Sequence, residues 1–286
     1  MKRALFALFA VFWVGVALGE SPAKIRITTW NLEWFPNGSA REATPEKQAQ
    51  RINAAASVLK TLNPDILLLQ EVRDYDACAR LAEAIQPGTY SVAICSAFKG
   101  GKQEEAILAK IPAQAAWSES WKSMEGIDPP RGFAFAWFKI GNANIGVYSV
   151  HLKSNLVTHG DPVAETAKNI RKREIAIDQL MTHVRDFIGA KIPAINRFII
   201  GGDFNTNHDQ AMFAAEKTLD ALGAGALRSV FDAIPFEQRI THPGTHGFPD
   251  ATFDYFFSKN VEMGKPIITQ SNVSDHLPVT CDVTIQ

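Results

Sequence analysis

Hydrophobic and polar positions along the chain follow two periods that replace each other from segment to segment. Residues 25–30 alternate between apolar and polar side chains, as in a strand with one buried face. After Thr44-Pro45, apolar side chains at positions 52, 55, 56, 59 and 62 share one face of a helix that ends at Asn63-Pro64. The run that follows, residues 65–70, is mostly apolar and is typical of a strand buried on both faces.

The same alternation continues to the end of the chain and predicts an α/β protein rich in strands. Further strands are expected near residues 90–95, 106–109, 132–140, 144–151, 197–202, 252–257 and 279–285, and further helices over residues 76–85, 164–188 and 210–222. Paired strands between helices favour two packed sheets with helices outside, but the pattern alone does not separate this arrangement from a single doubly wound sheet.

The first 19 residues differ from the rest of the chain. Lys2 and Arg3 precede an apolar run from Ala4 to Leu18, which small residues close at Gly19. This is the layout of a signal peptide, and the run is shorter than the roughly 20 apolar residues of a membrane-spanning helix. We therefore expect a signal peptide at residues 1–19 and one domain over residues 20–286. The mature protein is expected to be secreted or periplasmic, without stable insertion into the membrane.

Export would place the three cysteines in an oxidising compartment, where disulfides persist. Cys78 lies in a predicted helix and Cys95 ends the next strand, so a Cys78–Cys95 disulfide is expected, with Cys281 as a buried free thiol. No C-x-x-C spacing occurs, which disfavours structural zinc. The formal charge is −1, or about −3 once Lys2 and Arg3 leave with the leader. This balance excludes a globally basic nucleic-acid-binding protein, although a local groove can still be positive.

Polar side chains stand where the predicted strands end. Asn31 and Glu33 follow the first strand, Glu71 follows the second, and Asp203 and Asn205 follow a later buried strand. Because strand ends of one sheet converge at an edge where α/β proteins place their ligands, these side chains are expected to share a site. Their hard oxygen atoms suit Mg²⁺, with Mn²⁺ or Ca²⁺ as alternatives, better than zinc.

Two histidines add proton chemistry to these oxygen ligands. His151 ends a predicted strand, and His276 lies in a tight turn between Ser274 and Pro278. Histidine titrates near neutral pH, so one imidazole can take a proton from water while another donates a hydrogen bond to a phosphate oxygen. Together with a cation that neutralises developing negative charge, this is what cleavage of a phosphodiester requires.

Six short motifs carry a resemblance to a known family. They are Trp30-Asn31-Leu32-Glu33, Leu69-Gln70-Glu71-Val72, Ser149-Val150-His151-Leu152-Lys153-Ser154, Gly201-Gly202-Asp203-Phe204-Asn205, Phe253-Asp254-Tyr255 and Ser274-Asp275-His276-Leu277-Pro278. In this order, over about residues 25–285, they resemble the motifs of the endonuclease/exonuclease/phosphatase superfamily, which includes pancreatic-type deoxyribonuclease, sphingomyelinases and inositol-polyphosphate phosphatases. The resemblance implies a four-layer α/β/β/α sandwich of two mixed sheets flanked by helices.

The resemblance also implies a metal ligand set and a phosphate-binding pair. Glu71 is expected to bind the metal, with Asn31 and Asp275 beside it. Asp203 and Asn205 are expected to orient the attacking water and to hold the phosphate.

The histidines take the remaining roles that the resemblance implies. His151 is expected to donate a hydrogen bond to a non-bridging oxygen, and His276 to act as general base, oriented by Asp254. A carboxylate behind an imidazole fixes its tautomer and stabilises the imidazolium. Deoxyribonuclease-like members place a glutamate behind the first histidine. Register with the following strand puts Gln103 at that position here, ahead of the two glutamates that come next.

These observations predict a divalent-metal-dependent phosphodiester hydrolase, an endonuclease acting on DNA or RNA as a monomer. A phospholipid or inositol-phosphate phosphodiesterase is the alternative, and an idle binding module on the same scaffold is a second. Substrate choice is expected to lie in the loops at residues 33–44, 117–131 and 241–250. Lys153 and Arg171 are candidate phosphate contacts, although the charged run at residues 171–174 is more typical of a solvated helix face.

Overall fold

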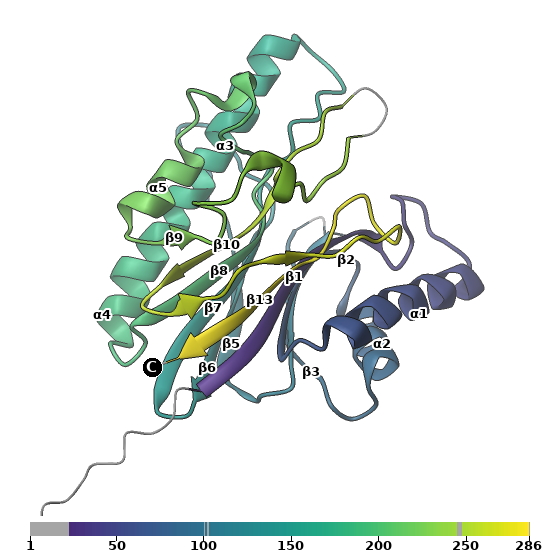
Figure 1. Ribbon diagram of the computed structural model, residues 1–286. Coiled ribbons are helices and arrows are strands. Elements are labelled where there is room, and N and C mark those ends of the chain that lie inside the picture. Colours follow the sequence, from purple (N-terminus) through teal and green to yellow (C-terminus); the bar gives the residue numbers. More distant parts are fainter. Residues whose placement is uncertain (1–22, 100, 102, 245–247, 286) are drawn as a thin grey trace, which may run out of the picture.

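The computed structural model describes residues 23–99, 101, 103–244 and 248–285. Within these residues the chain forms a seven-stranded and a six-stranded sheet packed face to face, with helices over both outer faces (Figure 1). This is the expected four-layer α/β/β/α sandwich, and it excludes a single doubly wound sheet. The predicted signal peptide, residues 1–19, lies outside the described residues.

The first sheet has the strand order β11-β13-β1-β2-β4-β3, with β12 beside β13. Its strands are β1 (Ala23–Phe35), β2 (Ile66–Val72), β3 (Ser91–Cys95), β4 (Glu104–Ala109), β11 (Glu262–Met263), β12 (Ile267–Ile268) and β13 (Val279–Ile285). The helix α1 (Pro45–Leu62) connects β1 to β2, which run parallel, so that Asn31 pairs with Gln70 and Glu71 follows it. Parallel pairing therefore brings the first two motifs to one edge.

The second sheet has the order β5-β6-β7-β8-β10-β9. Its strands are β5 (Ala113–Ser120), β6 (Gly132–Ile140), β7 (Ala143–His151), β8 (Arg197–Asp203), β9 (Arg228–Ser229) and β10 (Asp254–Lys259). Strands β7 and β8 are parallel, and β10 is antiparallel to β8. The register pairs His151 with Asp203 and Asp203 with Asp254, so three of the predicted site residues form one row across the sheet.

Side-chain alternation in the strands builds two cores, one between the sheets and one under the helices of the first sheet. On β2, Ile66 and Leu68 face the inter-sheet core, while Leu67 and Leu69 face α1 and α2 (Tyr75–Ile85). The outer face of the second sheet is covered by α3 (Pro162–Thr182), which continues into η1 (His183–Ile188) and α4 (Gly189–Lys191), and by α5 (Thr218–Ala224) (Figure 1). Polar contacts also cross between the sheets: Gln70 Nε2 donates to Ser149 Oγ at 2.9 Å, and Ser149 Oγ donates to the carbonyl oxygen of Leu69 at 3.4 Å.

Several elements differ from the sequence prediction, among them the short strands β9, β11 and β12, which were not expected. The helix expected over residues 210–222 is broken into the 3₁₀ turn η2 (Ala211–Phe213) and α5, because Glu216 turns inward to a buried arginine between them. The edge strand β5 was not predicted, since its alanines and polar residues have weak strand preference. It carries Trp117, which packs on Phe135 at a centroid distance of 4.4 Å. That part of the expected substrate loop is therefore packed against the fold. A further 3₁₀ turn, η3 (Phe236–Gln238), precedes β10.

The expected disulfide is wrong. Cys78 and Cys95 are both free thiols, although a hydrogen bond from Cys95 and burial raise the pKa of the Cys78 thiol well above its usual value. Cys281 is a free buried thiol, as predicted.

No helix in the described part of the chain is both long enough and apolar enough to cross a membrane.

Candidate active site

The site lies at the edge where β1, β2, β7 and β8 end, and Asn31 joins the two sheets there. Its Nδ2 donates to Glu71 Oε1 at 3.3 Å and to Asp203 Oδ2 at 3.0 Å. The second oxygen of Glu71 accepts from the backbone N–H of Trp34 at 3.0 Å. Glu71 has φ = 58°, a left-handed conformation that turns the chain out of β2 at this point. The amide thus holds one carboxylate from each sheet.

Asp203 is the centre of the cluster. Its Oδ2 also lies 3.4 Å from Nε2 of His151, while its Oδ1 accepts from the backbone N–H of Asn205 at 2.9 Å. Asn205, at φ = 54°, donates from Nδ2 to the carbonyl oxygen of Leu152 at 3.2 Å, which ties the loop after β8 to the loop after β7. The structure therefore brings together Asp203, Asn205 and His151, the residues that the motifs place at one site.

His276 enters the same cluster from the turn before β13. Its Nδ1 lies 2.8 Å from Oδ2 of the fully buried Asp254, and its Nε2 lies 3.7 Å from Asp203 Oδ2. The backbone is also held, since the carbonyl oxygen of His276 accepts from Trp30 Nε1 at 2.9 Å. Both backbone N–H groups at Phe253 and Asp254 donate to Thr241 Oγ1. The expected pairing of Asp254 with His276 is present.

The combined effects of burial and neighbouring charges raise the pKa values of His276 and Asp203 and lower that of His151. Burial lowers the pKa of His276, but the carboxylates of Asp254 and Asp203 outweigh it and raise that pKa to about 10. Burial, and next the charge of Asp254, raises the pKa of Asp203 to about 7 against the opposing effect of His276. The pKa of His151 is well below its usual value because of burial and the nearby charge of Arg131. At neutral pH His276 is thus cationic and His151 neutral.

Comparison with known proteins decides the family. The profile of the Endonuclease/Exonuclease/phosphatase family matches residues 28–276. The chain belongs to this family. Its enzymes are divalent-metal-dependent hydrolases of phosphoester bonds, and the chain is a hydrolase of this type. No curated protein matches.

Solved structures of family members share the fold at low identity. An endonuclease/exonuclease/phosphatase from Beutenbergia cavernae has a TM-score of 0.67 and 15% identity, covering 92% of this chain and 72% of its own. TDP2 from Caenorhabditis elegans has a TM-score of 0.63 and 18% identity, with coverage of 92% and 74%. An endonuclease/exonuclease/phosphatase from Bacteroides vulgatus has a TM-score of 0.65 and 14% identity, with coverage of 92% and 100%. At these identities the likeness concerns the fold.

In this family member the partner predicted for His151 is displaced. Gln103 accepts a hydrogen bond from Arg131 Nη1 at 3.3 Å, and the acidic side chain at His151 is Glu105, whose Oε1 accepts from the His151 backbone N–H at 3.0 Å. The reason is an irregularity in the pairing of β2 and β4, where Leu69 pairs with Ala106 but Val72 with Glu104. One extra residue on β2 shifts the count along β4. Nδ1 of His151 and Oε2 of Glu105 are buried, and neither has a partner within the described residues.

Two further side chains of the site were missed by the sequence prediction. Arg131 donates from Nε and Nη2 to the carbonyl oxygens of His151 and Leu152, at 3.0 and 2.7 Å. His242 packs edge-on against His276, with a centroid distance of 4.8 Å. Arg131 lies in no motif, and His242 stands among five histidines that the sequence gives no partner. In both cases the sequence carries no signal for the contact.

Of the two residues predicted to contact phosphate, Arg171 and Lys153, only Lys153 lies close to His151 in the chain. Arg171 forms ion pairs with Glu125 and Glu174, at 2.9 and 3.4 Å, away from the catalytic cluster. Lys153 lies two residues after His151 and is half-buried, and burial and the nearby Arg131 lower its pKa to about 8. Lys153 is thus the candidate that remains beside the site.

The metal ligands expected for a member of this family fit the donor set of the structure. Asn31 and Glu71 are in contact, and the hydroxyl of Ser274 donates to the carbonyl oxygen of Asn31 and lies 3.3 Å from Asp275 Oδ1. The pKa of Glu33 is raised by burial, by Asp275 and by Glu71, which shows that negative charge gathers at this edge. Several oxygen ligands with excess negative charge suit a hard divalent cation such as Mg²⁺.

Proposed function

We propose that the protein is an exported phosphodiesterase that cleaves DNA or RNA with a divalent metal, as a monomer. The observation that carries this proposal is the convergence of three side-chain nitrogens on one carboxylate oxygen. Asp203 Oδ2 accepts a hydrogen bond from Asn31 Nδ2 at 3.0 Å, and the Nε2 atoms of His151 and His276 lie 3.4 and 3.7 Å from it. Polar nitrogens that converge from both sheets form an anion-binding point, which a phosphate oxygen can share during the reaction.

The protonation states of Asp203 and His276 support transfer of a proton from the attacking water to Asp203. With a pKa of about 7, Asp203 is suited to accept a proton from the attacking water at neutral pH, and His276 with its pKa of about 10 donates a hydrogen bond. The His276–Asp203 pair therefore shares the proton taken from water, with Asp254 orienting His276. Neutral His151 donates to a non-bridging oxygen. A divalent cation held by Glu71, Asn31 and Asp275 would neutralise charge that develops on the phosphate.

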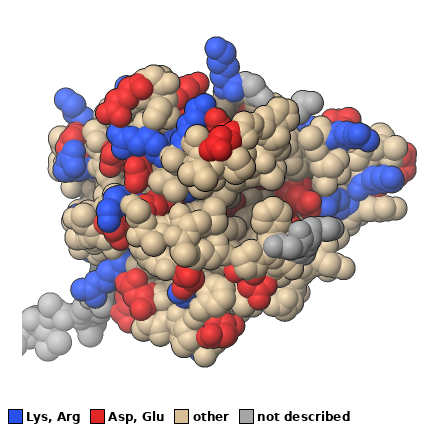
Figure 2. Space-filling model, turned by 90° about the horizontal axis from the view of Figure 1, so that it is seen from above, with Lys and Arg blue, Asp and Glu red and all other residues tan. Residues whose placement is uncertain are grey.

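Support for a polyanionic substrate is local. The charge of Lys153 lies near those of Arg131 and Lys172, but Arg131 is buried, Glu165 is also near, and the buried Arg173 is paired with Glu216. The support is therefore limited to Lys153 and Lys172. Elsewhere Lys and Arg side chains are mixed with Asp and Glu, as on the face in Figure 2, and the net charge is −1. Such a surface gives no long-range attraction to a polyanion. The assay that tests the proposal therefore also includes a phospholipid and an inositol phosphate as substrates.

The test is an assay of purified residues 20–286 against plasmid DNA, RNA, sphingomyelin, an inositol polyphosphate and a bis-aryl phosphodiester. Each substrate is incubated with Mg²⁺, Mn²⁺ or EDTA. We expect nicking of plasmid DNA or cleavage of RNA with metal and none with EDTA. Cleavage of only sphingomyelin or the inositol polyphosphate would show that the protein is a phospholipid or inositol-phosphate phosphodiesterase instead. Failure with every substrate would refute the enzymatic proposal. Sedimentation velocity on the same sample tests the monomer.

The variant that tests the site is His276→Ala. We expect a loss of at least roughly 10³-fold in kcat, because acid–base groups typically contribute 10²–10⁴-fold. The matched control is His208→Ala, since His208 is an exposed histidine paired with Asp220. This control should keep full activity. If His276→Ala stays within a few-fold of the unchanged protein, the role given to His276 is wrong.

Export is the part of the proposal that rests on residues 1–19 alone. Expression of the full chain in a bacterial host, followed by fractionation and mass determination of the exported protein, tests it. We expect a mature chain that begins near residue 20, outside the cytoplasm. Retention of the full-length chain in the cytoplasm would refute export and would leave the proposed chemistry unaffected.

A further inference from the structure

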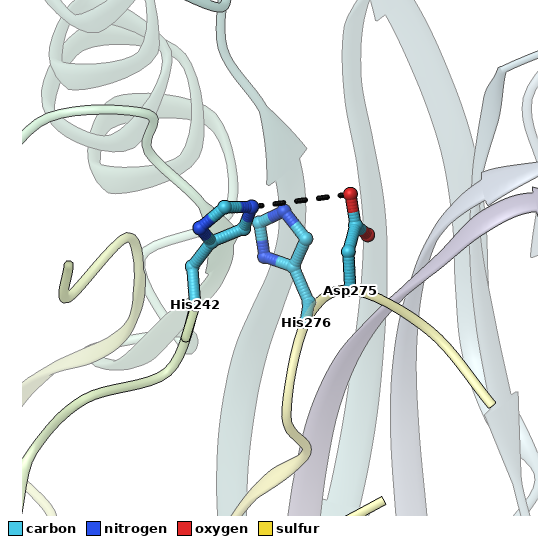
Figure 3. Close-up of side chains that lie close together, drawn as sticks. All are labelled: His242, Asp275 and His276. Carbon is cyan, nitrogen blue, oxygen red and sulfur yellow. Dashed lines mark ion pairs between the residues drawn. The ribbon is translucent and has the colours of Figure 1, made fainter. Parts of the chain in front are cut away.

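His242 lies against the catalytic turn, although it belongs to no motif of the family. Its backbone N–H and carbonyl both bond to Ala251, at 3.0 and 2.9 Å, and the neighbouring Thr241 carbonyl accepts from the backbone N–H of Leu277 at 2.7 Å. These contacts fix the segment before β10 against the turn of Asp275 and His276. Figure 3 shows the three side chains Asp275, His276 and His242 side by side, with His242 and Asp275 on either side of the His276 ring.

The three side chains present ligand atoms to one point. His242 Nε2 lies 3.9 Å from Asp275 Oδ2, and His242, Asp275 and His276 each offer one ligand atom within 4.8 Å of the other two. The Nδ1 atom of His276 is taken by Asp254, so Nε2 is the atom that it can offer. Nδ1 of His242 is buried and has no partner in the described part of the chain. With 18% and 45% of their side chains exposed, His242 and Asp275 leave this point open to solvent.

We propose that His242, Asp275 and His276 bind a zinc ion, and that this ion inhibits the enzyme. Two imidazoles and one carboxylate, with water in the fourth position, are a typical zinc set, whereas Mg²⁺ prefers oxygen ligands. In a tetrahedral site with bonds of about 2.0–2.1 Å, ligand atoms lie about 3.3–3.5 Å apart. His242 Nε2 and Asp275 Oδ2 therefore need to approach by about 0.5 Å, and the other pairs by at most about 1.5 Å, which side-chain rotations supply.

Inhibition follows from the residues that the ion would occupy, and this part rests on the proposed function. His276 Nε2 is the atom that faces Asp203 Oδ2, 3.7 Å away. An ion on Nε2 removes this nitrogen from the His276–Asp203 pair that takes the proton from water. It also takes Asp275, which we assign to the hydrolytic metal. The second cluster of this kind, Asp203, Asp254 and His276, is fully buried and Asp254 is bound to His276 already, so it is less suited to an exchanging ion.

Metal binding is measured first, without reference to activity. Residues 20–286 in excess Mg²⁺ are titrated with Zn²⁺ by calorimetry and with Co²⁺ by visible absorption, which reports tetrahedral coordination. The variant is His242→Gln. The matched control is His208→Gln, because His208 Nε2 also lies 3.9 Å from a carboxylate, that of Asp220, but it is not part of a three-ligand group among the described residues.

We expect one Zn²⁺ ion per chain and a tetrahedral Co²⁺ spectrum in the unchanged protein and in the His208→Gln control. In His242→Gln the Kd for Zn²⁺ should rise by about tenfold or more, since loss of even an outer-shell partner costs about 10–100-fold in affinity. Equal affinity in the unchanged protein and His242→Gln would overturn the site.

Inhibition is measured as the ratio of the rates with and without Zn²⁺ for each variant, so that a change in the basal rate cancels. We expect inhibition at the concentration where Zn²⁺ binds, and a shift of at least about tenfold in His242→Gln. Zinc binding through His242 without inhibition would overturn the inhibitory role. If no substrate is hydrolysed at all, the proposed function fails, and the binding experiment alone still decides on the zinc site.

Discussion

Arg173 is a buried arginine whose removal tests how the loops around the site are held. Its side chain is fully buried on α3, where Nε and Nη2 donate to the two oxygens of Glu216 at 2.8 and 2.6 Å. Nη1 donates at 2.8 Å to both the carbonyl oxygen of Lys153 and Oδ1 of Asn155. Asn155 in turn donates to the carbonyl oxygen of Asn205 at 2.7 Å. One guanidinium therefore joins the loops after β7 and β8.

The cost of Arg173→Met can be worked from these contacts. Glu216, with 2% of its side chain exposed, would be left as an unpaired buried carboxylate, which costs about 3–5 kcal/mol. The two acceptors at Lys153 and Asn155 would each lose a bond worth about 1 kcal/mol. We expect the free energy of unfolding to fall by about 5–7 kcal/mol, which is a large part of the roughly 5–15 kcal/mol of a typical domain.

The assay is urea unfolding at 15 °C, followed by tryptophan fluorescence, for Arg173→Met, Glu216→Leu and the double variant. Replacing both partners by apolar groups removes the unpaired charge, so the double variant should regain most of the stability lost in either single variant. Arg173→Lys keeps the charge without the two-pronged contact, and it should lose about 2 kcal/mol. If the losses of the single variants simply add in the double variant, the ion pair does not hold the two loops together.

Three further predictions concern the backbone and the pH dependence of stability. Gly202 has φ = 146°, and a Cβ atom would lie 1.9 Å from the carbonyl oxygen of Val150, so Gly202→Ala should cost at least about 3 kcal/mol in urea unfolding. The control Gly88→Ala, also at positive φ but with open space, should cost only about 1 kcal/mol. Thr241→Val leaves two buried N–H groups without their acceptor and should cost about 2 kcal/mol or more, whereas Thr241→Ser should restore the stability. Because the pKa of Lys153 is lowered from 10.5 to about 8, the unfolded chain binds more protons between these pH values, so stability should rise with pH across this window and Lys153→Met should reduce the rise. An unchanged pH slope in Lys153→Met would contradict the shift.

The sequence was sufficient for the side chains that parallel strands bring together. Asn31 and Glu71 follow neighbouring parallel strands, as do His151 and Asp203, and each pair shares an edge without any long-range information. His276 was also found, because the Ser-Asp-His-Leu-Pro turn is a motif in its own right. A local sequence pattern is enough to predict such a site, because parallel pairing brings the ends of neighbouring strands to the same edge of the sheet.

The sequence was not sufficient where a contact depends on exact register or on a distant loop. Gln103 bonds to Arg131 and Glu105 to the backbone N–H of His151, while Nδ1 of the His151 ring has no partner among the described residues. The pairing at the end of β2 is irregular, which strand preference does not encode. Arg131 reaches carbonyl oxygens some 20 residues further along the chain, and His242 meets His276 through packing of two turns. A charged side chain in a loop has no periodic pattern that would distinguish such a contact from exposure to solvent.

The division of the site between the sheets explains why glycine precedes Asp203 in the motif on β8. The second sheet supplies His151, Asp203 and Asp254, and the first supplies Asn31 and Glu71, so the bond of 3.0 Å from Asn31 to Asp203 spans the sandwich. A Cβ atom on Gly201 would lie 2.5 Å from the ring of Phe256 and 2.8 Å from a methyl group of Leu68, which belongs to the opposite sheet.

Any larger residue at position 201 would push these packed groups, and the sheets with them, apart. A hydrogen bond tolerates only a few tenths of an ångström before it weakens. The close approach of the sheets at Gly201 is therefore a condition for the contact between Asn31 and Asp203. Packing in the core and the geometry of the active site are, in this protein, set by the same few atoms.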